Sequence, residues 1–523
     1  MKLNKASDIQ DLKYFVTALC LLLIGCNKHI EKSNSVSFHT LSENQKTNNE
    51  FSFLFDHISD VQKENGLVGA EVLIIRNDTI QIHDVVGWSD RENKLKLKKN
   101  SLYRIRSMTK PIIATAILIL LEEDKLDLED PVYKYIPSFD NPKADYITIK
   151  QCLTHTSGLG NHDWQNIGLS KVATEFETLS ELVNEIGING KFTEPNKMRY
   201  SDSGYAVLTE IIALISGMPA EDFIKSRIFK PLDMSNSHTY FEPNVNWASQ
   251  LNPTYRWNER INDFEQYWNP KMEQDYKFFR GHGGVYTSTM DYAKFLKMWL
   301  NNGKFNNNQI LSEKTINYAI TETILQPLGA PQSHQGLAWM MMKPDSSSSD
   351  TGYLMHGGSD GTMAFAYPNE NTIALYFTQS RNHPRFIFEN LMAITEPYSN
   401  YRKWNYNNIY LDEWKEVLVR YKNTDTVISI ENAESYIGKY KCTTNKGFDS
   451  EIVLKNGQLV IRNINSGYET NLYQYKVNEF ICRFRPPPDG FISKIIFRGD
   501  ENDFDSFSLE WLNKTKFEFE KLK

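Results

Sequence analysis

Two stretches of the chain alternate between apolar and polar residues, and each contains a turn signal near its centre. Residues 69–88, GAEVLIIRNDTIQIHDVVGW, predict a β-hairpin that turns at Asn77 and Asp78. Residues 361–380, GTMAFAYPNENTIALYFTQS, predict a second hairpin that turns at 369–371. The sequence between the hairpins has mostly helical spacing. We therefore expect one antiparallel sheet built from both ends of this region, and an α+β fold rather than a parallel doubly wound one.

Four stretches space their apolar residues as an amphipathic or buried helix does. They are 51–65, the stretch from 107 into the acidic run 122–131, 204–217 and 287–303. Gly217 is the expected stop of the third helix, and Thr287 or Ser288 is the expected N-cap of the fourth. The second helix is apolar almost all round from Ile112 to Leu121, so it should be buried.

The alternation returns near residue 430 and continues to the end of the chain. Residues 431–523 therefore predict a small all-β domain. Residues 396–430, which contain the amphipathic LDEWKEVLVRYK, are the expected connector to a larger domain at 51–395. Residues 26–50 are polar and without periodicity, and they predict a flexible tether.

Length, composition and charge limit the possible classes of protein. With 523 residues the chain is too long for one core, and 40% hydrophobic and 24% charged residues exclude a disordered chain. The net charge is -7 and no basic stripe stands out, which argues against nucleic acid as a partner. The sequence has no His-Glu-x-x-His or Cys-x-x-Cys pattern and no phosphate-binding loop, so we predict neither a metal nor a cofactor.

The N-terminus predicts export. Lysines precede an apolar run at 14–24, which is too short to cross a membrane but suits a signal peptide over 1–25. LIGC, ending at Cys26, resembles a bacterial lipobox, in which the cysteine is lipidated. We expect a membrane-anchored lipoprotein, periplasmic or cell-surface; the alternative is an ordinary signal peptide with an incidental cysteine. In the oxidising compartment that export implies, Cys442 and Cys482 could pair or stay free.

Ser107 and Lys110 lie three residues apart where the long apolar helix begins. Pro111 is tolerated only in a first helical turn, which puts the helix start near Ser107. Positions i and i+3 share a helix face, so the two side chains should meet. Burial would lower the pKa of Lys110, which could then exchange a proton with the Ser107 hydroxyl. The alternative is an N-cap serine followed by a lysine that reaches solvent.

Five segments in order resemble one family. They are RIRSMTKPIIATAILILLEEDKLDLEDPVYKYIP, ITIKQCLTHTSGLG, YSDSGYAVL, FKPLDMSNS and GGVYTSTMDYAKFLKMWLNNG. They are similar to serine β-lactamases and penicillin-binding proteins, specifically the branch of class C β-lactamases, D-Ala-D-Ala carboxypeptidases and esterases. The resemblance covers roughly 52–395. It implies a β-lactamase/transpeptidase-like fold: an antiparallel sheet flanked by helices, with a helical subdomain.

The family also implies a Ser-x-x-Lys nucleophile, a Tyr-x-Asn motif on a loop, and a Lys-Thr-Gly or His-x-Gly motif on a strand. Tyr200 in YSDSG matches the second motif. HGG occurs twice, at His282 before a predicted helix and at His356 before the second hairpin, so we assign the third motif to His356 and its neighbours through Gly358. His155 and His282 are expected to be structural.

The resemblance implies a role for each matching residue. Ser107 would attack a carbonyl, with Lys110 and Tyr200 as candidate bases; which of them takes the first proton stays open. The backbone N–H groups of Ser107 and Ser359, beside Gly358, would form the oxyanion hole.

Two residues depart from the pattern of β-lactamases. Asp202 stands where these enzymes have an asparagine, and it is expected to hold Lys110 or to point at a substrate amine. His356 replaces a fixed cation. We expect it to titrate between about pH 5 and 8, so that recognition of a substrate carboxylate becomes weak and pH-dependent.

Together these features predict a serine hydrolase that forms an acyl-enzyme at Ser107 with a small peptide, amide or ester, of D-amino-acid peptidase, carboxypeptidase or esterase type. Two alternatives remain. One is a true β-lactamase, and the other is a catalytically silent binding protein like a penicillin-binding protein. Residues 431–523 resemble the small lipocalin-like domains of some hydrolases in this branch. The oligomeric state stays open.

Overall fold

The computed structural model describes most of both predicted domains. The described ranges are 38–41, 58–59, 62–63, 66–162, 167–239, 245–381 and 432–522, with short gaps inside the last two. The predicted signal peptide, Cys26 and the connector at 396–430 lie outside the described residues, as does most of the helix predicted at 51–65. Within the predicted tether, His39–Thr40 (β1) form a short strand that pairs in parallel with the first hairpin.

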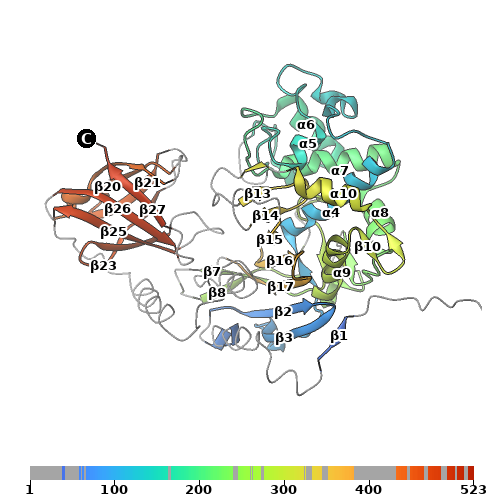
Figure 1. Ribbon diagram of the computed structural model, residues 1–523, viewed down its shortest axis with the longest axis horizontal. Helices are drawn as coiled ribbons and strands as arrows, with labels where there is room; N and C mark the ends of the chain where they lie inside the picture. Colours follow the sequence, from blue (N-terminus) through green and yellow to red (C-terminus); the bar gives the residue numbers. More distant parts are fainter. Residues whose placement is uncertain are drawn as a thin grey trace, which may run out of the picture.

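The larger domain is built on a ten-stranded, mostly antiparallel sheet, with strand order β1-β3-β2-β17-β16-β15-β14-β13-β12 and β4 paired to β3. Its other strands are β2 Gly69–Arg76, β3 Thr79–Asp90, β4 Leu95–Lys96, β12 Ile324–Leu325, β13 Ser333–Gln335, β14 Met340–Met342, β15 Tyr353–Gly358, β16 Thr362–Tyr367 and β17 Thr372–Thr378. Because β2 pairs with β17, the sheet joins the two hairpins from both ends of the domain, which confirms the prediction (Figure 1).

The first hairpin shows how local sequence produces this sheet. Asn77 and Asp78 adopt φ angles of 49° and 60°, the left-handed conformation that a two-residue hairpin turn requires. Along β2, Leu73 and Ile75 pack into the core with the helices, whereas Val72 packs into a second core on the opposite face. Both faces of this central strand are therefore buried.

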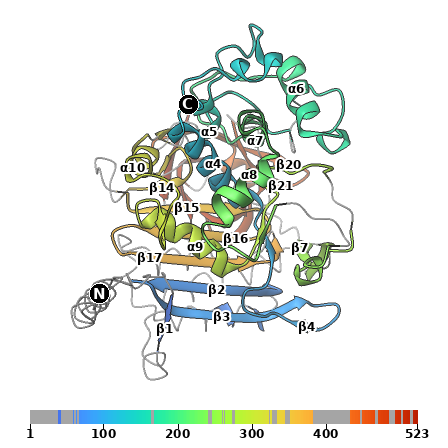
Figure 2. The ribbon, with the colours of Figure 1, turned by 90° about the vertical axis from the view of Figure 1, so that its right-hand side faces the viewer.

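Helices cover one face of the sheet and form a separate group beyond it. They are α4 Lys110–Glu122, α5 Ile149–Leu153, α6 Leu179–Asn189, α7 Asp202–Ser216, α8 Ala220–Ile224, α9 Thr289–Leu300 and α10 Glu313–Thr321. In Figure 2, α4 and α9 lie toward the sheet, and α5, α6 and α7 gather at the top as the predicted helical subdomain. Gly217 ends α7 with φ 71°, and Ser288 caps α9.

Shorter elements complete the larger domain. They are the 3₁₀ helices η1 Arg106–Thr109, η2 Val132–Lys134, η3 Pro137–Phe139, η4 Ala173–Glu175 and η6 Ala248–Gln250, the π-helical turn η5 Lys225–Phe229, and the strands β5 Tyr103–Arg104, β6 Ser237–His238, β7 Thr254–Asn258, β8 Asp263–Trp268, β9 Tyr286–Thr287, β10 Lys304–Phe305, β11 Asn308–Gln309 and β18 Ser380–Arg381. The helix predicted from Ser107 thus begins with the 3₁₀ turn η1 and continues as α4, whose residues from Lys110 to Leu120 are all buried.

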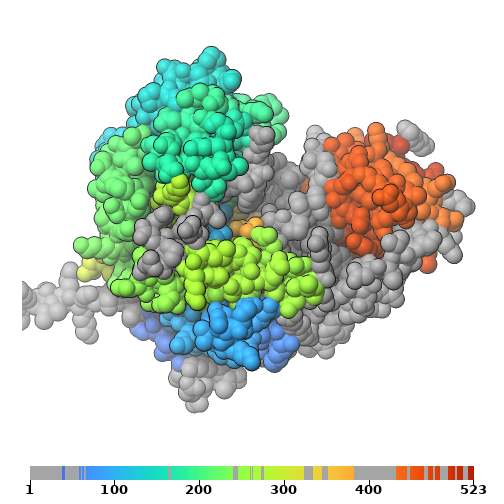
Figure 3. All heavy atoms as spheres, turned by 180° about the vertical axis from the view of Figure 1, so that it is seen from behind, coloured from blue at the N-terminus to red at the C-terminus, as the bar shows by residue number. Residues whose placement is uncertain are grey.

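Residues 432–522 form a barrel-like sheet of nine strands, as predicted for the C-terminal domain. After the 3₁₀ turn η8 Ala433–Tyr436, the strands are β19 Gly438–Cys442, β20 Ser450–Lys455, β21 Gln458–Asn463, β22 Glu469–Asn471, β23 Tyr473–Lys476, β24 Glu479–Arg483, β25 Ile492–Asp500, β26 Asp503–Trp511 and β27 Lys516–Lys521. They enclose their own aromatic-rich core, and Figure 3 shows this region in orange and red. Cys442 and Cys482 are buried free thiols, so the disulfide considered above is absent.

Within the described part of the chain, no helix is both long and apolar enough to cross a membrane. The same residues contain no group of three or more His, Cys, Asp or Glu side chains that could hold a metal ion.

Candidate active site

Ser107 lies in η1, at the start of the buried helix α4. The preceding residue, Arg106, has φ 47°, a left-handed conformation that is costly for a residue with a Cβ. Hydrogen bonds to the loop at Val285 hold the segment in place: the Ile105 N–H donates to the Val285 carbonyl at 3.2 Å, and the Val285 N–H donates to Thr109 Oγ at 3.1 Å. The turn that presents Ser107 is therefore anchored on both sides.

Lys110 is completely buried and brings the predicted site residues together. Its Nζ atom donates to Ser107 Oγ at 3.3 Å and to Asp202 Oδ1 at 2.5 Å. It also donates to the carbonyl of His282 at 3.1 Å, and it lies 4.6 Å from the ring centre of Tyr200. Of the two sequence interpretations of Asp202, the geometry supports the one in which it holds Lys110.

The protonation states differ from the sequence prediction. Burial lowers the pKa of Lys110, but the Asp202 carboxylate, with a smaller contribution from the phenolic oxygen of Tyr200, outweighs burial and raises the pKa above its ordinary value. Burial also raises the pKa of Tyr200, and the charge of Lys110 offsets this only in part. The prediction of a lowered Lys110 pKa was wrong because it included burial but not the carboxylate. In the resting site both groups are protonated.

Tyr200, Ser201 and Asp202 are held at the start of α7. Ser201 Oγ accepts the N–H of Gly204 at 3.0 Å as the helix N-cap, which places Asp202 in the first turn, where a negative charge is favourable. The Ser201 N–H donates to Nδ1 of His155 at 3.1 Å, and the His155 ring lies 4.5 Å from that of Tyr200. Burial and the charge of Lys110 lower the pKa of His155 to about 3, so it is a neutral acceptor. Its contacts match the structural role expected for it.

His356 lies on β15, and only 3% of it is exposed. Its Nδ1–H donates to the Gly357 carbonyl at 2.9 Å, and its ring centre is 6.4 Å from that of Tyr200. Burial and the charge of Lys110 lower the pKa of His356 to about 3. The expected titration between about pH 5 and 8 is therefore contradicted, and His356 supplies no cation for a substrate carboxylate in that range.

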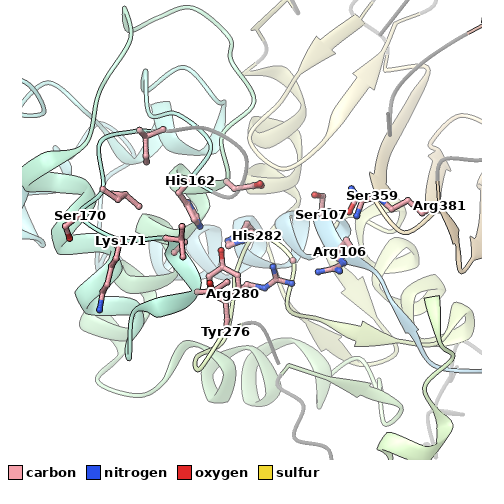
Figure 4. A pocket seen from close by; sticks show the side chains of 17 residues that line it. Arg106, Ser107, His162, Ser170, Lys171, Tyr276, Arg280, His282, Ser359 and Arg381 are labelled. Carbon is pink, nitrogen blue, oxygen red and sulfur yellow. The ribbon is translucent and has the colours of Figure 1, made fainter. Parts of the chain in front are cut away.

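Gly358 brings β15 against the segment that carries the nucleophile. A Cβ atom there would lie 2.2 Å from the Ile105 carbonyl oxygen and 2.3 Å from Thr362 Oγ1, so only glycine fits. Ser359 follows directly and lines the same pocket as Ser107. Figure 4 shows the two serine side chains near each other in this pocket; the oxyanion hole formed by their backbone N–H groups stays a prediction.

The pocket in front of Ser107 has a volume of about 890 Å³. Asp202 and His282 also line it. Sequence reasoning missed six other lining residues with basic or aromatic side chains: Arg106, His162, Lys171, Tyr276, Arg280 and Arg381. Only Arg106 had a usable signal, its place next to the nucleophile; the others come from segments without a recognisable motif.

Comparison with known proteins agrees with this geometry. Residues 54–396 match the family Beta-lactamase. A Bacillus subtilis (strain 168) protein named as penicillin-binding protein PbpX is 32% identical over 268 residues, which cover 51% of this chain and 61% of PbpX. The teichoic acid D-alanine hydrolase of Staphylococcus aureus (strain MRSA252) is 24% identical over 346 residues, which cover 64% of this chain and 77% of the hydrolase. The chain thus spans about three fifths of the length of PbpX.

A solved structure supports the fold. The octameric penicillin-binding protein homologue from Pyrococcus abyssi superposes with a TM-score of 0.54 at 18% identity, covering 90% of this chain and 99% of that chain. The family match extends over well more than half of the chain, and Ser107, Lys110 and Tyr200 meet in one site as the resemblance implied. The chain belongs to the beta-lactamase family of serine hydrolases.

Proposed function

We propose that the protein hydrolyses small D-amino-acid peptides, amides or esters through an acyl-enzyme at Ser107. The observation that carries this proposal is the position of the Lys110 ammonium, which contacts Ser107 Oγ and Asp202 and lies against the ring of Tyr200. A serine hydroxyl beside a buried pair of titratable groups is the arrangement that nucleophilic catalysis needs.

The first step depends on which groups of the site carry a proton at rest. At rest Lys110 donates to Ser107 Oγ, so it cannot accept the serine proton. The reactive form is the one in which the Lys110 and Tyr200 pair has lost a proton; that pair then takes the proton of Ser107 as Oγ attacks the carbonyl. The N–H groups of Ser107 and Ser359 receive the oxyanion, and the pair returns the proton to the leaving group. In the second half the pair takes a proton from water as the water oxygen attacks the acyl carbonyl. The bond to Ser107 Oγ then breaks, and the pair returns the proton to Ser107 as the acid product leaves.

The substrate class rests on the relatives and on the departures from β-lactamases. One relative is named as a D-alanine hydrolase, which favours a D-alanyl ester or amide. A buried carboxylate at Asp202 and a neutral His356 replace the amide and the cation of the β-lactamase motifs. We therefore place peptidase, amidase or esterase activity before β-lactam hydrolysis.

The experiment is covalent labelling followed by substrate profiling. A fluorophosphonate probe should label Ser107, and Ser107→Ala should abolish both labelling and turnover. Ser226→Ala, at an exposed serine of η5, is the matched control and should change neither. D-alanyl p-nitroanilide and p-nitrophenyl acetate should be cleaved faster than nitrocefin. Labelling that persists in Ser107→Ala would reject the assignment, and the absence of turnover of every substrate would favour a silent binding protein.

We also propose that the protein is exported and lipid-anchored at Cys26, because a short apolar run precedes LIGC. Mass spectrometry of the protein from its native membrane should find a diacylated or triacylated Cys26 at the N-terminus. An unmodified terminus at another residue would reject the anchor.

A further inference from the structure

Three arginine side chains converge on one buried carboxylate at the wall of the pocket. Asp360 is 1% exposed, and its Oδ2 atom lies 2.8 Å from Arg106 Nε and 3.3 Å from Arg104 Nε. Its Oδ1 atom lies 3.8 Å from Arg381 Nη1 and accepts a hydrogen bond from the hydroxyl group of Tyr267. We call Arg104, Arg106 and Arg381 the arginine cluster.

The arginine cluster carries more charge than Asp360 can balance. Guanidinium groups stay protonated in proteins, and no other carboxylate among the described residues forms an ion pair with any of the three. Their side chains are 6%, 13% and 17% exposed, so two positive charges in excess are largely withdrawn from water. Buried charge without a counter-charge is costly.

The arginine cluster also has unused donors. Arg104 Nη1 and Arg381 Nε are buried, and neither has a hydrogen-bond partner among the described residues. Arg106 and Arg381 line the pocket together with Ser107 and Ser359. In Figure 4, Arg106 lies next to Ser107, and Arg381 lies beyond Ser359.

The rest of the pocket has the same sign of charge. Lys171 and Arg280 line it as well. Asp202 is the only carboxylate among the described lining residues, and Lys110 is bound to it. A pocket lined by one sign of charge attracts ligands of the opposite sign.

We propose that the arginine cluster is an anion-binding subsite that holds a carboxylate or phosphate group of the substrate beside Ser107. This inference deepens the proposed function and rests on it. Planar guanidinium groups bind both kinds of oxyanion through paired hydrogen bonds. The subsite also supplies the cation that His356, neutral and buried, does not. It therefore selects substrates that carry an anionic group close to the bond that is cleaved.

The test measures binding in the full-length Ser107→Ala variant, so it does not depend on acyl transfer. Calorimetry compares N-acetyl-D-alanine, methyl phosphate and the neutral N-acetyl-D-alanine methyl ester. We expect at least one anion to bind about tenfold or more tightly than the ester, with an affinity that falls as salt is added. The anion that binds more tightly identifies the carboxylate or the phosphate as the recognised group.

A second arm locates the subsite. Adding Arg381→Gln should lower the affinity for the preferred anion about tenfold and leave that for the ester unchanged. Adding Arg227→Gln, which removes an exposed arginine paired with Glu123, is the matched control and should change neither affinity. Equal binding of anions and ester, or an Arg381→Gln variant with unchanged anion affinity, would overturn the proposal. The comparison of ligands needs no arginine variant, so it decides the question even if Arg381→Gln folds poorly.

The two proposals can fail separately. Anion binding in Ser107→Ala without any turnover by the unmutated protein would reject the hydrolase and keep the subsite. Turnover with no preference for an anion would do the opposite.

Discussion

The ammonium nitrogen of Lys110 lies 2.5 Å from Oδ1 of Asp202, and both side chains are almost completely buried. This ion pair keeps Lys110 protonated and makes it a donor to Ser107 Oγ. A proton must leave the Lys110 and Tyr200 pair before the serine can be activated. The rate should therefore depend on the protonation of this pair. Asp202 should determine the pH range in which the rate changes.

Asp202→Asn tests this link. The charge of Asp202 raises the pKa of both Lys110 and Tyr200, so its removal lowers both. The rate rises with pH as the pair loses a proton, and this rise is the acid limb of the pH–rate profile. The limb should move to lower pH in Asp202→Asn whichever group is the base. Opposite charges at this distance shift a pKa by about one to three units, which is the expected displacement. The measurement is kcat/KM on a neutral ester from about pH 5 to about pH 10, in which the unmutated protein should still be rising at the upper end, because both pKa values are raised, whereas Asp202→Asn should begin to level off.

The control for this prediction is Asp222→Asn, which removes an exposed carboxylate paired with Lys225 and should leave the limb in place. Asp202→Asn also leaves Lys110 buried without its partner, so it should lower the free energy of unfolding by about 3 kcal/mol. An acid limb that stays fixed or moves to higher pH would show that Asp202 does not control the base.

His356 should remain neutral throughout the range in which an ordinary histidine titrates. Burial and Lys110 lower its pKa to about 3. In ¹³C-histidine NMR, its imidazole resonance should therefore not move between about pH 5 and about pH 8. His356→Gln identifies the resonance by its loss, and histidine signals that do move in the same series confirm the change of pH. A midpoint near the ordinary value of about 6.5 would restore the titrating role predicted from the sequence.

Local patterns predicted the parts of the fold that local forces decide. The period-two alternation and the turn at Asn77 and Asp78 produced the first hairpin, and the uninterrupted apolar run after Lys110 produced a buried helix. Ser107, Lys110 and Tyr200 were found because motifs mark them. None of these assignments required knowing which distant residue lies opposite.

The predictions that failed depend on contacts between residues far apart in the sequence. The pKa of Lys110 was predicted to fall because burial follows from the sequence around it. Asp202, 92 positions away along the chain, was expected either to hold Lys110 or to point at a substrate amine, and only the structure shows that it contacts Lys110. The arginine cluster was missed for the same reason, because Arg106 and Asp360 are 254 positions apart. The direction of a pKa shift in a buried site depends on such pairs of distant residues. The sequence of one segment therefore cannot show whether the pKa of a buried group rises or falls.

The C-terminal domain should survive separation from the larger domain. Its nine strands enclose a core of their own, whose residues belong to no other cluster. Limited proteolysis of the full-length protein should therefore cut within 396–430 and leave two folded fragments, recognised by mass spectrometry and circular dichroism. The fragment that contains Ser107 should keep its fluorophosphonate labelling. Early cleavage inside both domains, with 396–430 intact, would contradict this boundary.

The last prediction compares two neighbouring glycines of β15. In Gly358→Ala, the new Cβ would lie 2.2 Å from the Ile105 carbonyl, which is backbone and cannot turn aside. Either β15 or the turn that presents Ser107 must move, and a displacement of about 1 Å at a reacting group costs roughly a hundredfold in rate. In Gly357→Ala, the nearest atom is Met363 Sδ at 2.7 Å, near the end of a flexible side chain.

Gly357→Ala is thus the matched control for Gly358→Ala: the chemical change is the same and the strand is the same, but the obstacle can rotate away. We expect Gly358→Ala to lower kcat/KM about a hundredfold and to reduce fluorophosphonate labelling of Ser107 in parallel, because the attacking hydroxyl itself is displaced. Overpacking should also lower its free energy of unfolding by about 1 to 3 kcal/mol, whereas Gly357→Ala should stay close to the unmutated protein in both measurements. If the two variants behave alike, the contact between Gly358 and Ile105 does not position the nucleophile.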